Sequence, residues 1–224
     1  PFKKLINQGM ILGTSAFVLR AEVSSHLCSG DLDEEFMNLK LPATIIEYDL
    51  LKKYNKLKDK LDSLNSKMHN NDKIETLLDN YWVYRIIDIV DSNLEGVEYQ
   101  DKIKESFTES DIVDLKEITV VLSRLLQILE KQHSDEAFRL SFNPYDPFSV
   151  AFNFSPIRID LKFINESNNE LLIDKFLKDS KYSLEFKDVN FILFGNSSKF
   201  TVGREVEKMS KSYYNVVTPD DICT

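Results

Sequence analysis

The sequence predicts an α+β fold in which two mixed α/β segments flank a long helical insert. Three observations lead to this prediction. The middle of the chain repeats apolar residues at helical spacing, residues 157–164 alternate apolar and polar side chains as strands do, and the prolines of "FNPYDPF" separate the two patterns. With 224 residues, of which 42% are hydrophobic, the chain is long enough to bury a core of its own.

The first segment, residues 1–23, is expected to change from helix to strand. "PFKKLINQ" places Phe2, Leu5 and Ile6 on one face of a short helix, which Gly9 ends. One short strand is then expected at "MIL" and a second at "AFVLR". The polar stretch 24–42 contains "SGDLDEE" and predicts a loop.

Residues 24–155 contain the predicted helical insert. From residue 50 onward, apolar residues are separated alternately by four and three positions, which is the heptad spacing of one narrow helical seam. A second helix is expected over "KIETLLDNYWVYRIIDIVDSN", which carries Trp82, and a third from about Ser110. Short polar breaks between them predict an antiparallel bundle or a long hairpin. The seam consists of Leu50, Tyr54, Leu57, Leu61, Leu64 and Met68.

The first of these helices is rich in lysine, which allows two interpretations. The lysines could contact RNA phosphates, or they could pair with the acidic helices that follow. We favour pairing, because the insert carries 25 acidic against 15 basic side chains, a balance unsuited to a broad nucleic-acid surface. Trp82 is expected in the helical core rather than on a base-stacking platform, because aromatic side chains at such helix positions more often belong to the core. The lysines concerned are Lys52, Lys53, Lys56, Lys58, Lys60 and Lys67.

Residues 156–200 are expected to form a small α/β subdomain. "IRIDLKFI" predicts a half-buried strand, "NELLIDKFLKDS" a short helix, "VNFILF" a strand and "GNSS" a turn. "KFTVGREVE" predicts one further strand, which runs into residues 201–224.

A polar stretch near the end of the chain, "KMSKS" at residues 208–212, is the strongest candidate for chemistry. Lys208 and Lys211 supply two ammonium groups on flexible stems, which suit a phosphate group that moves during a reaction. When a nucleoside triphosphate is cleaved at its α-phosphorus, negative charge grows on the departing pyrophosphate. Two lysines on a loop that closes late would stabilise that charge in the transition state.

This stretch resembles the signature loop of class I aminoacyl-tRNA synthetases. Its flanks, "VEKMSKSYYNVVTPDDI", are similar to those of leucyl-tRNA synthetases of the bacterial type, and "PFKKLINQGMI" resembles the segment with which that family returns to its nucleotide-binding fold. The resemblance implies that 1–23 and 201–224 are pieces of a split Rossmann-type catalytic domain. It also implies that 156–200 corresponds to a leucine-specific subdomain.

The activity implied by the resemblance is ATP-dependent activation of leucine, followed by its transfer to tRNA(Leu). Lys208 and Lys211 would be the catalytic residues that meet the ATP phosphates, Ser210 and Ser212 would shape the loop, and the main chain near Met209 would approach adenine. All five would bind ATP. Magnesium is expected to accompany ATP, although no metal ligands can be identified in the sequence.

The sequence departs from the family pattern at two places. Tyr213 and Tyr214 stand where the family commonly has lysine and glycine, so the loop loses the conformational freedom of glycine. The family's His-x-Gly-His turn is absent, since His26, His69 and His133 stand apart. We therefore expect the isolated chain to be an inactive, monomeric piece of the enzyme.

The two ends of the chain fit this expectation. The sequence begins at Pro1 rather than Met, and "TPDDICT" places Thr218, Pro219 and Asp221 as the start of a helix that stops after one turn. An excised fragment of a longer protein is expected.

No apolar run approaches the ~18 residues of a membrane span, and the start lacks the apolar core of a signal peptide. Cys28 and Cys223 lie far apart and outside any CxxC pair, which favours reduced thiols. We therefore expect a cytoplasmic protein without membrane contact.

Two other functions stay open at this point. The helical insert could be the working part of a non-enzymatic interaction module, with a coincidental signature loop. Alternatively, the parent could be a class I synthetase for isoleucine, valine or methionine, because the side-chain pocket lies outside the sequence.

Overall fold

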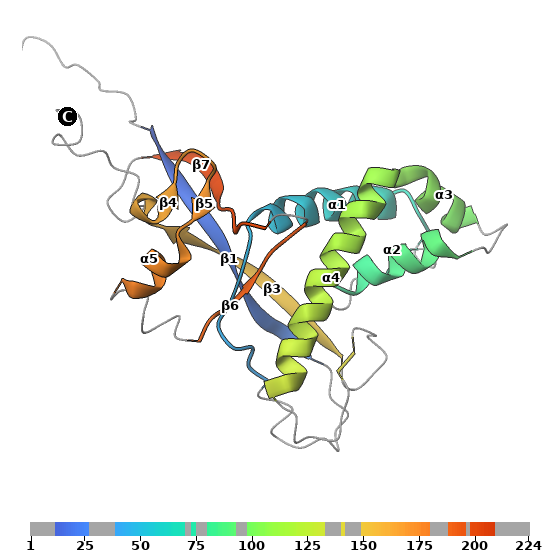
Figure 1. The fold of residues 1–224 in the computed structure, drawn as a ribbon. Helices are drawn as coiled ribbons and strands as arrows, with labels where there is room; N and C mark the ends of the chain where they lie inside the picture. Colours follow the sequence, from blue (N-terminus) through green and yellow to red (C-terminus); the bar gives the residue numbers. More distant parts are fainter. Residues whose placement is uncertain are drawn as a thin grey trace, which may run out of the picture.

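A mixed sheet of five strands is built around one long strand, β1 (Leu12–His26) (Figure 1). The computed structural model describes residues 12–26, 39–69, 73–74, 80–92, 98–132, 140–141, 149–179, 188–195 and 198–208. β1 pairs antiparallel with β3 (Val150–Ile159) along one edge, and with β2 (Thr44–Ile46) and β7 (Gly203–Lys208) along the other. β6 (Asn190–Ile192) continues the sheet in parallel to β2.

The sheet separates two hydrophobic cores because the residues of β1 alternate between its faces. Ala16 and Val18 belong to one core, whereas Phe17 and Leu19 belong to the other. All four side chains are buried. A strand that is apolar on both faces needs cover on both faces, and the two α-helical parts of the chain supply it.

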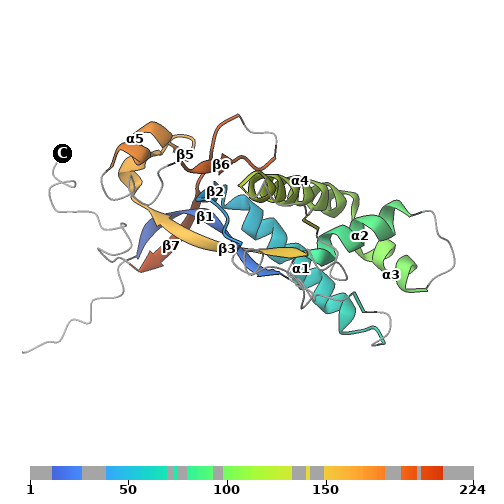
Figure 2. The same ribbon diagram turned by 90° about the horizontal axis from the view of Figure 1, so that it is seen from below.

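Four helices cover the face of Phe17 and Leu19: α1 (Asp49–Asn65), α2 (Tyr81–Asp91), α3 (Glu98–Ser106) and α4 (Glu109–Gln132). α4 packs against both α1 and α2, and α3 packs against α2. Figures 1 and 2 show that α2 and α3 lie at the end of the molecule farthest from β7. None of the helices in the part of the chain that the structure describes is long and apolar enough to cross a membrane.

A smaller unit covers the face of Ala16 and Val18. It contains a 3₁₀ turn (Leu161–Phe163), the hairpin of β4 (Ile164–Asn165) and β5 (Glu170–Leu171), and the short helix α5 (Ile173–Lys178). Phe163 packs edge-on against Phe176 of α5, with ring centroids 5.8 Å apart. Helices and a mixed sheet thus occur together, which agrees with the predicted α+β class.

Several predicted elements need correction. β1 is one continuous strand of 15 residues, where the sequence predicted two short strands and then a loop from residue 24. β3 begins at Val150, seven residues before the predicted strand, and ends at Ile159, where a 3₁₀ turn replaces its predicted second half. The insert holds a fourth helix, α3, which the sequence analysis did not predict.

The predicted domain boundaries stay predictions. β1 runs across the boundary at residue 23 and β3 across the one at residue 155, so one sheet is shared by segments that were assigned separately. The predicted helix at residues 2–8 lies outside the described residues, as do Cys28, Cys223 and His133.

Candidate functional site

β7 carries the chain into the predicted phosphate loop. Its pairing with β1 runs from Gly203, opposite Phe17, to Lys208, opposite Leu12. Lys208 is therefore the last residue of the strand. Its side chain, together with Met209, Ser210, Lys211 and Ser212, lies outside what the structure describes, so the assigned roles of these five residues stay predictions.

Residues that precede β7 in the chain are hydrogen-bonded to a buried carboxylate. Glu47 lies directly after β2 and is only 2% exposed. One of its oxygens accepts hydrogen bonds from the backbone N–H of Thr201 at 2.7 Å and from the Thr201 hydroxyl at 2.9 Å. The other accepts the backbone N–H of Phe194 at 2.5 Å. Both oxygens thus act as acceptors, and these hydrogen bonds fix Phe194 and Thr201 to the end of β2.

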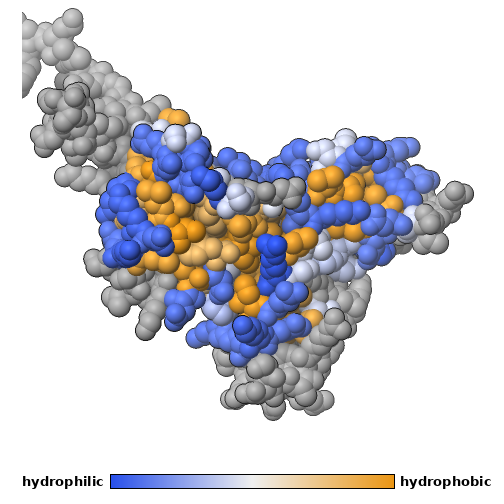
Figure 3. All heavy atoms as spheres, viewed as in Figure 1, coloured by the Kyte–Doolittle hydropathy of each residue, from blue (hydrophilic) through white to orange (hydrophobic). Residues whose placement is uncertain are grey.

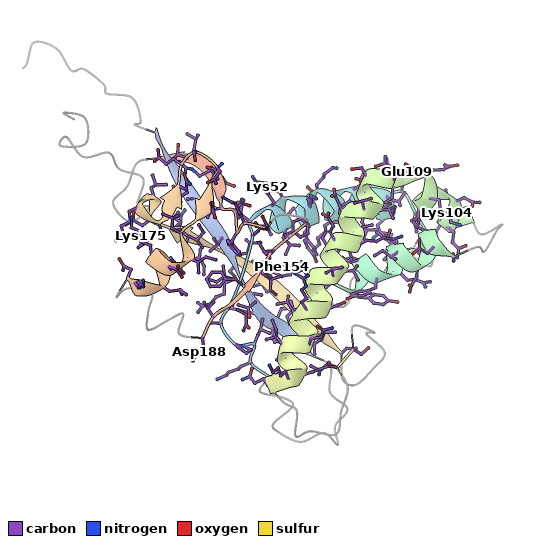
Figure 4. All side chains as sticks on the ribbon, in the orientation of Figure 1. Lys52, Lys104, Glu109, Phe154, Lys175 and Asp188 are labelled. Carbon is purple, nitrogen blue, oxygen red and sulfur yellow. The ribbon has the colours of Figure 1, made fainter. Side chains whose placement is uncertain are left out.

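The first residue of β7 touches the helical insert. A Cβ atom on Gly203 would clash with the Tyr48 ring, so only glycine allows this close approach. The Tyr48 hydroxyl donates to the Glu205 carboxylate at 2.5 Å, and its ring stacks on Phe17 with centroids 5.5 Å apart. Lys52 lies over the same ring at 5.3 Å; Figure 4 labels this lysine near the start of α1.

The lysines of α1 pair with α4, which confirms the preferred interpretation for three of them. Lys53 contacts Asp114 at 2.7 Å and Glu117 at 2.9 Å. Partial burial lowers the pKa of Lys53, but the hydrogen bonds that its ammonium group donates to these two carboxylates outweigh burial and leave its pKa above the ordinary value. The ammonium group of Lys53 is therefore paired with carboxylates of α4 within the fold.

Asp111 of α4 receives the other two lysines and is 2% exposed. Lys60 approaches it at 2.5 Å and Lys56 at 3.3 Å. It also accepts the backbone N–H of Thr108 at 2.9 Å and its hydroxyl at 2.7 Å, a cap at the start of α4. Burial raises the pKa of Asp111, but the hydrogen bonds from Lys60, Thr108 and Lys56 prevail and hold its pKa well below the usual range.

Trp82 lies in the core of the insert, as predicted. Its side chain is fully buried, and its indole N–H donates to the hydroxyl of Tyr54 at 3.1 Å. A fully buried ring offers no face to a nucleobase.

A pocket of about 640 Å³ opens between α4 and the edge strand β6. Figure 3 shows an apolar area between α4 and the smaller unit, and exposed polar side chains of α4 border the pocket. The residues lining it include no pair suited to acid–base or nucleophilic catalysis, so no reaction is assigned to it. They are Pro42, Arg124, Gln127, Ile128, Lys131, Gln132, Asn190, Phe191 and Ile192.

No group of three or more His, Cys, Asp or Glu side chains that could hold a metal ion is found in the described ranges. His69, the one histidine whose side chain the structure describes, is exposed.

Sequence analysis missed the residues that hold β7. Two signals pointed to them. Glu47 is a single charge that directly follows the apolar run "TII", and Gly203 interrupts a strand pattern, which often marks a close approach by another group. Neither signal identifies the partner, because Glu47 and Thr201 are 154 positions apart.

Comparison with known proteins gives one consistent name. The chain is 56% identical over 71 residues to the leucine–tRNA ligase of Flavobacterium johnsoniae, a match of 32% of this chain and 7% of that protein. Over this part, the chain is similar to leucine–tRNA ligases. The ligase of Flavobacterium psychrophilum is 57% identical over 67 residues, 30% of this chain and 7% of the ligase. That of Porphyromonas gingivalis is 38% identical over 71 residues, with 32% and 7% covered.

These leucine–tRNA ligases are far longer than the matched segment, which spans about 7% of their length. No family model matches the chain. No solved structure matches it either. The similarity therefore concerns about a third of the chain.

Proposed function

We propose that this chain is part of a leucine–tRNA ligase that activates leucine with ATP and transfers it to tRNA(Leu). The observation that carries this proposal is the similarity at 56% and 57% identity to two proteins of that name. The resemblance of residues 201–224 to the family's signature loop supports it independently of fold. The alternative of a non-enzymatic helical module draws no support from these matches.

Under this proposal, residues 1–23 and 201–224 are pieces of a split Rossmann-type catalytic domain. Residues 24–155 are an insert, and 156–200 correspond to the leucine-specific subdomain. The parent enzyme works in the cytoplasm, and the isolated chain is a monomer without activity of its own.

The proposed chemistry rests on the two lysines of the loop. Lys208 stands at the end of β7, which delivers the loop, and Lys211 follows three residues later. Both ammonium groups would meet the triphosphate and stabilise the charge that develops on pyrophosphate as leucine attacks. Met209, Ser210 and Ser212 would complete the ATP contacts. Magnesium would arrive with ATP and neutralise part of the phosphate charge.

Replacement of Lys211 by alanine in the full-length protein tests the proposal. We expect leucine-dependent ATP–pyrophosphate exchange to fall about 100-fold. The substitution removes one ammonium group that faces the departing pyrophosphate, which costs about 3 kcal/mol of transition-state stabilisation. Lys67→Ala is the matched control, because Lys67 is exposed and lies just beyond α1. Exchange at the wild-type rate in Lys211→Ala would remove the loop from the mechanism.

A further inference from the structure

Within the described part of the chain, the end of the sheet that leads to the loop is a two-stranded ribbon. β3 pairs with β1 only from Ala16 onward. Among the described strands, residues 12–15 of β1 therefore pair with β7 alone, through its residues 205–208. An isolated two-stranded ribbon is marginally stable in water, so its direction depends on what holds its base.

Tyr48 contacts β7 at two positions where the ribbon joins the rest of the sheet. Its ring fills the space that a side chain on Gly203 would occupy, and its hydroxyl donates to Glu205, two residues further along β7. Tyr48 is 8% exposed, and its ring is also stacked on Phe17 of β1. Both strands at the root of the ribbon thus contact one tyrosine.

This tyrosine belongs to the helical insert. It is the residue that precedes the first turn of α1. α1 is in turn tied to α4 by the ion pairs of Lys53 and Asp111 described above. Lys53 also lies over the ring of Phe194 at 4.9 Å, beside the segment that Glu47 fixes. The position of the insert is therefore transmitted to β7 through the start of α1.

We propose that Tyr48 and Glu205 are a positioning pair, by which the helical insert sets the direction in which β7 presents the loop at residues 208–212. This inference rests on the proposed function. At a rise of about 3.3 Å per residue, Glu205 lies about 10 Å from Lys208, the last residue of β7, so a small rotation of the ribbon moves the point from which the loop starts. A misplacement of about 1 Å at reacting groups is enough to slow a reaction strongly.

The test compares two Tyr→Phe variants of the full-length protein. Tyr48→Phe keeps the ring over Gly203 and removes only the hydroxyl. Tyr84→Phe removes a hydroxyl that bonds Ser123 at 3.3 Å within the insert, between α2 and α4, and serves as the matched control. We expect Tyr48→Phe to lower kcat of leucine-dependent ATP–pyrophosphate exchange about tenfold, the equivalent of about 1.4 kcal/mol. The KM for leucine stays within about twofold of wild type, and Tyr84→Phe keeps wild-type kcat.

A double-mutant cycle with Glu205 separates positioning from general damage. Glu205→Gln keeps an acceptor for the Tyr48 hydroxyl and should retain most of the activity, whereas Glu205→Ala should match Tyr48→Phe. The double variant Tyr48→Phe/Glu205→Ala should be no slower than either single variant, because both remove the same hydrogen bond.

The outcomes distinguish this inference from the function it rests on. A wild-type protein without leucine-dependent exchange overturns the proposed function, and the positioning role with it. If the wild type is active, three results would each overturn the positioning pair alone. They are a wild-type kcat for Tyr48→Phe, an equally low kcat for Tyr84→Phe, and additive effects of the two substitutions in the cycle.

Discussion

Glu47 joins parts of the chain that are far apart in sequence. Its carboxylate is 2% exposed and accepts three hydrogen bonds from Phe194 and Thr201. A buried carboxylate is costly unless such donors surround it, and here both oxygens are used. The residue therefore fixes the segment before β7 to the end of β2.

Glu47→Gln should lower the free energy of unfolding of the 224-residue chain by about 2 kcal/mol, because an amide NH₂ must then face one of the buried backbone N–H donors. The fluorescence of Trp82, the single tryptophan, reports unfolding in urea. Glu166→Gln, at an exposed position beside β4, is the control and should change stability by less than about 0.5 kcal/mol. Equal urea midpoints for Glu47→Gln and Glu166→Gln would show that Glu47 contributes no more to stability than an exposed glutamate does.

α1 and α4 are held together at the scale of whole elements by charge as well as by their apolar seams. The heptad residues Leu50, Tyr54, Leu57 and Leu61 of α1 are all buried. Along the flank of the same contact, Asp111 collects two lysines and caps the start of α4. One carboxylate thus fixes both the pairing of the helices and the point where α4 begins.

Asp111→Asn should destabilise the chain by about 2 kcal/mol at pH 7, since the amide cannot replace the ionised acceptor. The pKa of Asp111 is lower in the folded state than in the unfolded chain, so its contribution is complete above the ordinary aspartate pKa of about 4. It is lost as the pH falls below that value. The difference between the two proteins in urea unfolding should therefore be constant from pH 7 to pH 5 and shrink from pH 4 to pH 3.

The same comparison needs an exposed aspartate as its control. Asp59 lies on α1 and its side chain is exposed, so Asp59→Asn serves as this control. It should change stability by less than about 0.5 kcal/mol at every pH. A difference for Asp111→Asn that grows on acidification would show that the ionised Asp111 carboxylate does not stabilise the fold.

The elements differ in how well the sequence predicts them. α1 was predictable because a regular heptad identifies a helix and its buried face at once. α3 was missed because "EYQDKIKES" is mostly polar, and its place against α2 depends on tertiary contacts. β3 begins earlier than predicted because the prediction relied on the regular alternation from Ile157 onward, whereas the strand also includes Pro156. It lies at the edge of the sheet, where proline is tolerated.

Only part of the candidate site could be proposed from the sequence, for a physical reason. The short motif "KMSKS" places two lysines and two serines within five consecutive residues, so the residues of the loop could be proposed from sequence alone. The residues that hold its strand, such as Tyr48 and Glu205, are ordinary side chains 157 positions apart. Only the fold brings them together.

At the scale of the whole molecule, one sheet carries two different coverings. The four helices lie on one face and the smaller unit on the other, and β1 contributes to both cores. β7 leaves this sheet beside the start of β1, where contacts from the insert converge on it. The insert is thereby attached to the strand that leads to the proposed ATP loop rather than suspended on a linker.

The most direct test of the central claim is ATP–pyrophosphate exchange by the full-length protein with leucine, isoleucine, valine and methionine in turn. We predict exchange with leucine, and a kcat/KM for each of the other three amino acids that is at least about tenfold lower. Exchange that is best with another amino acid would reassign the substrate. Absence of exchange with all four would contradict the claim that the chain belongs to a leucine-activating enzyme.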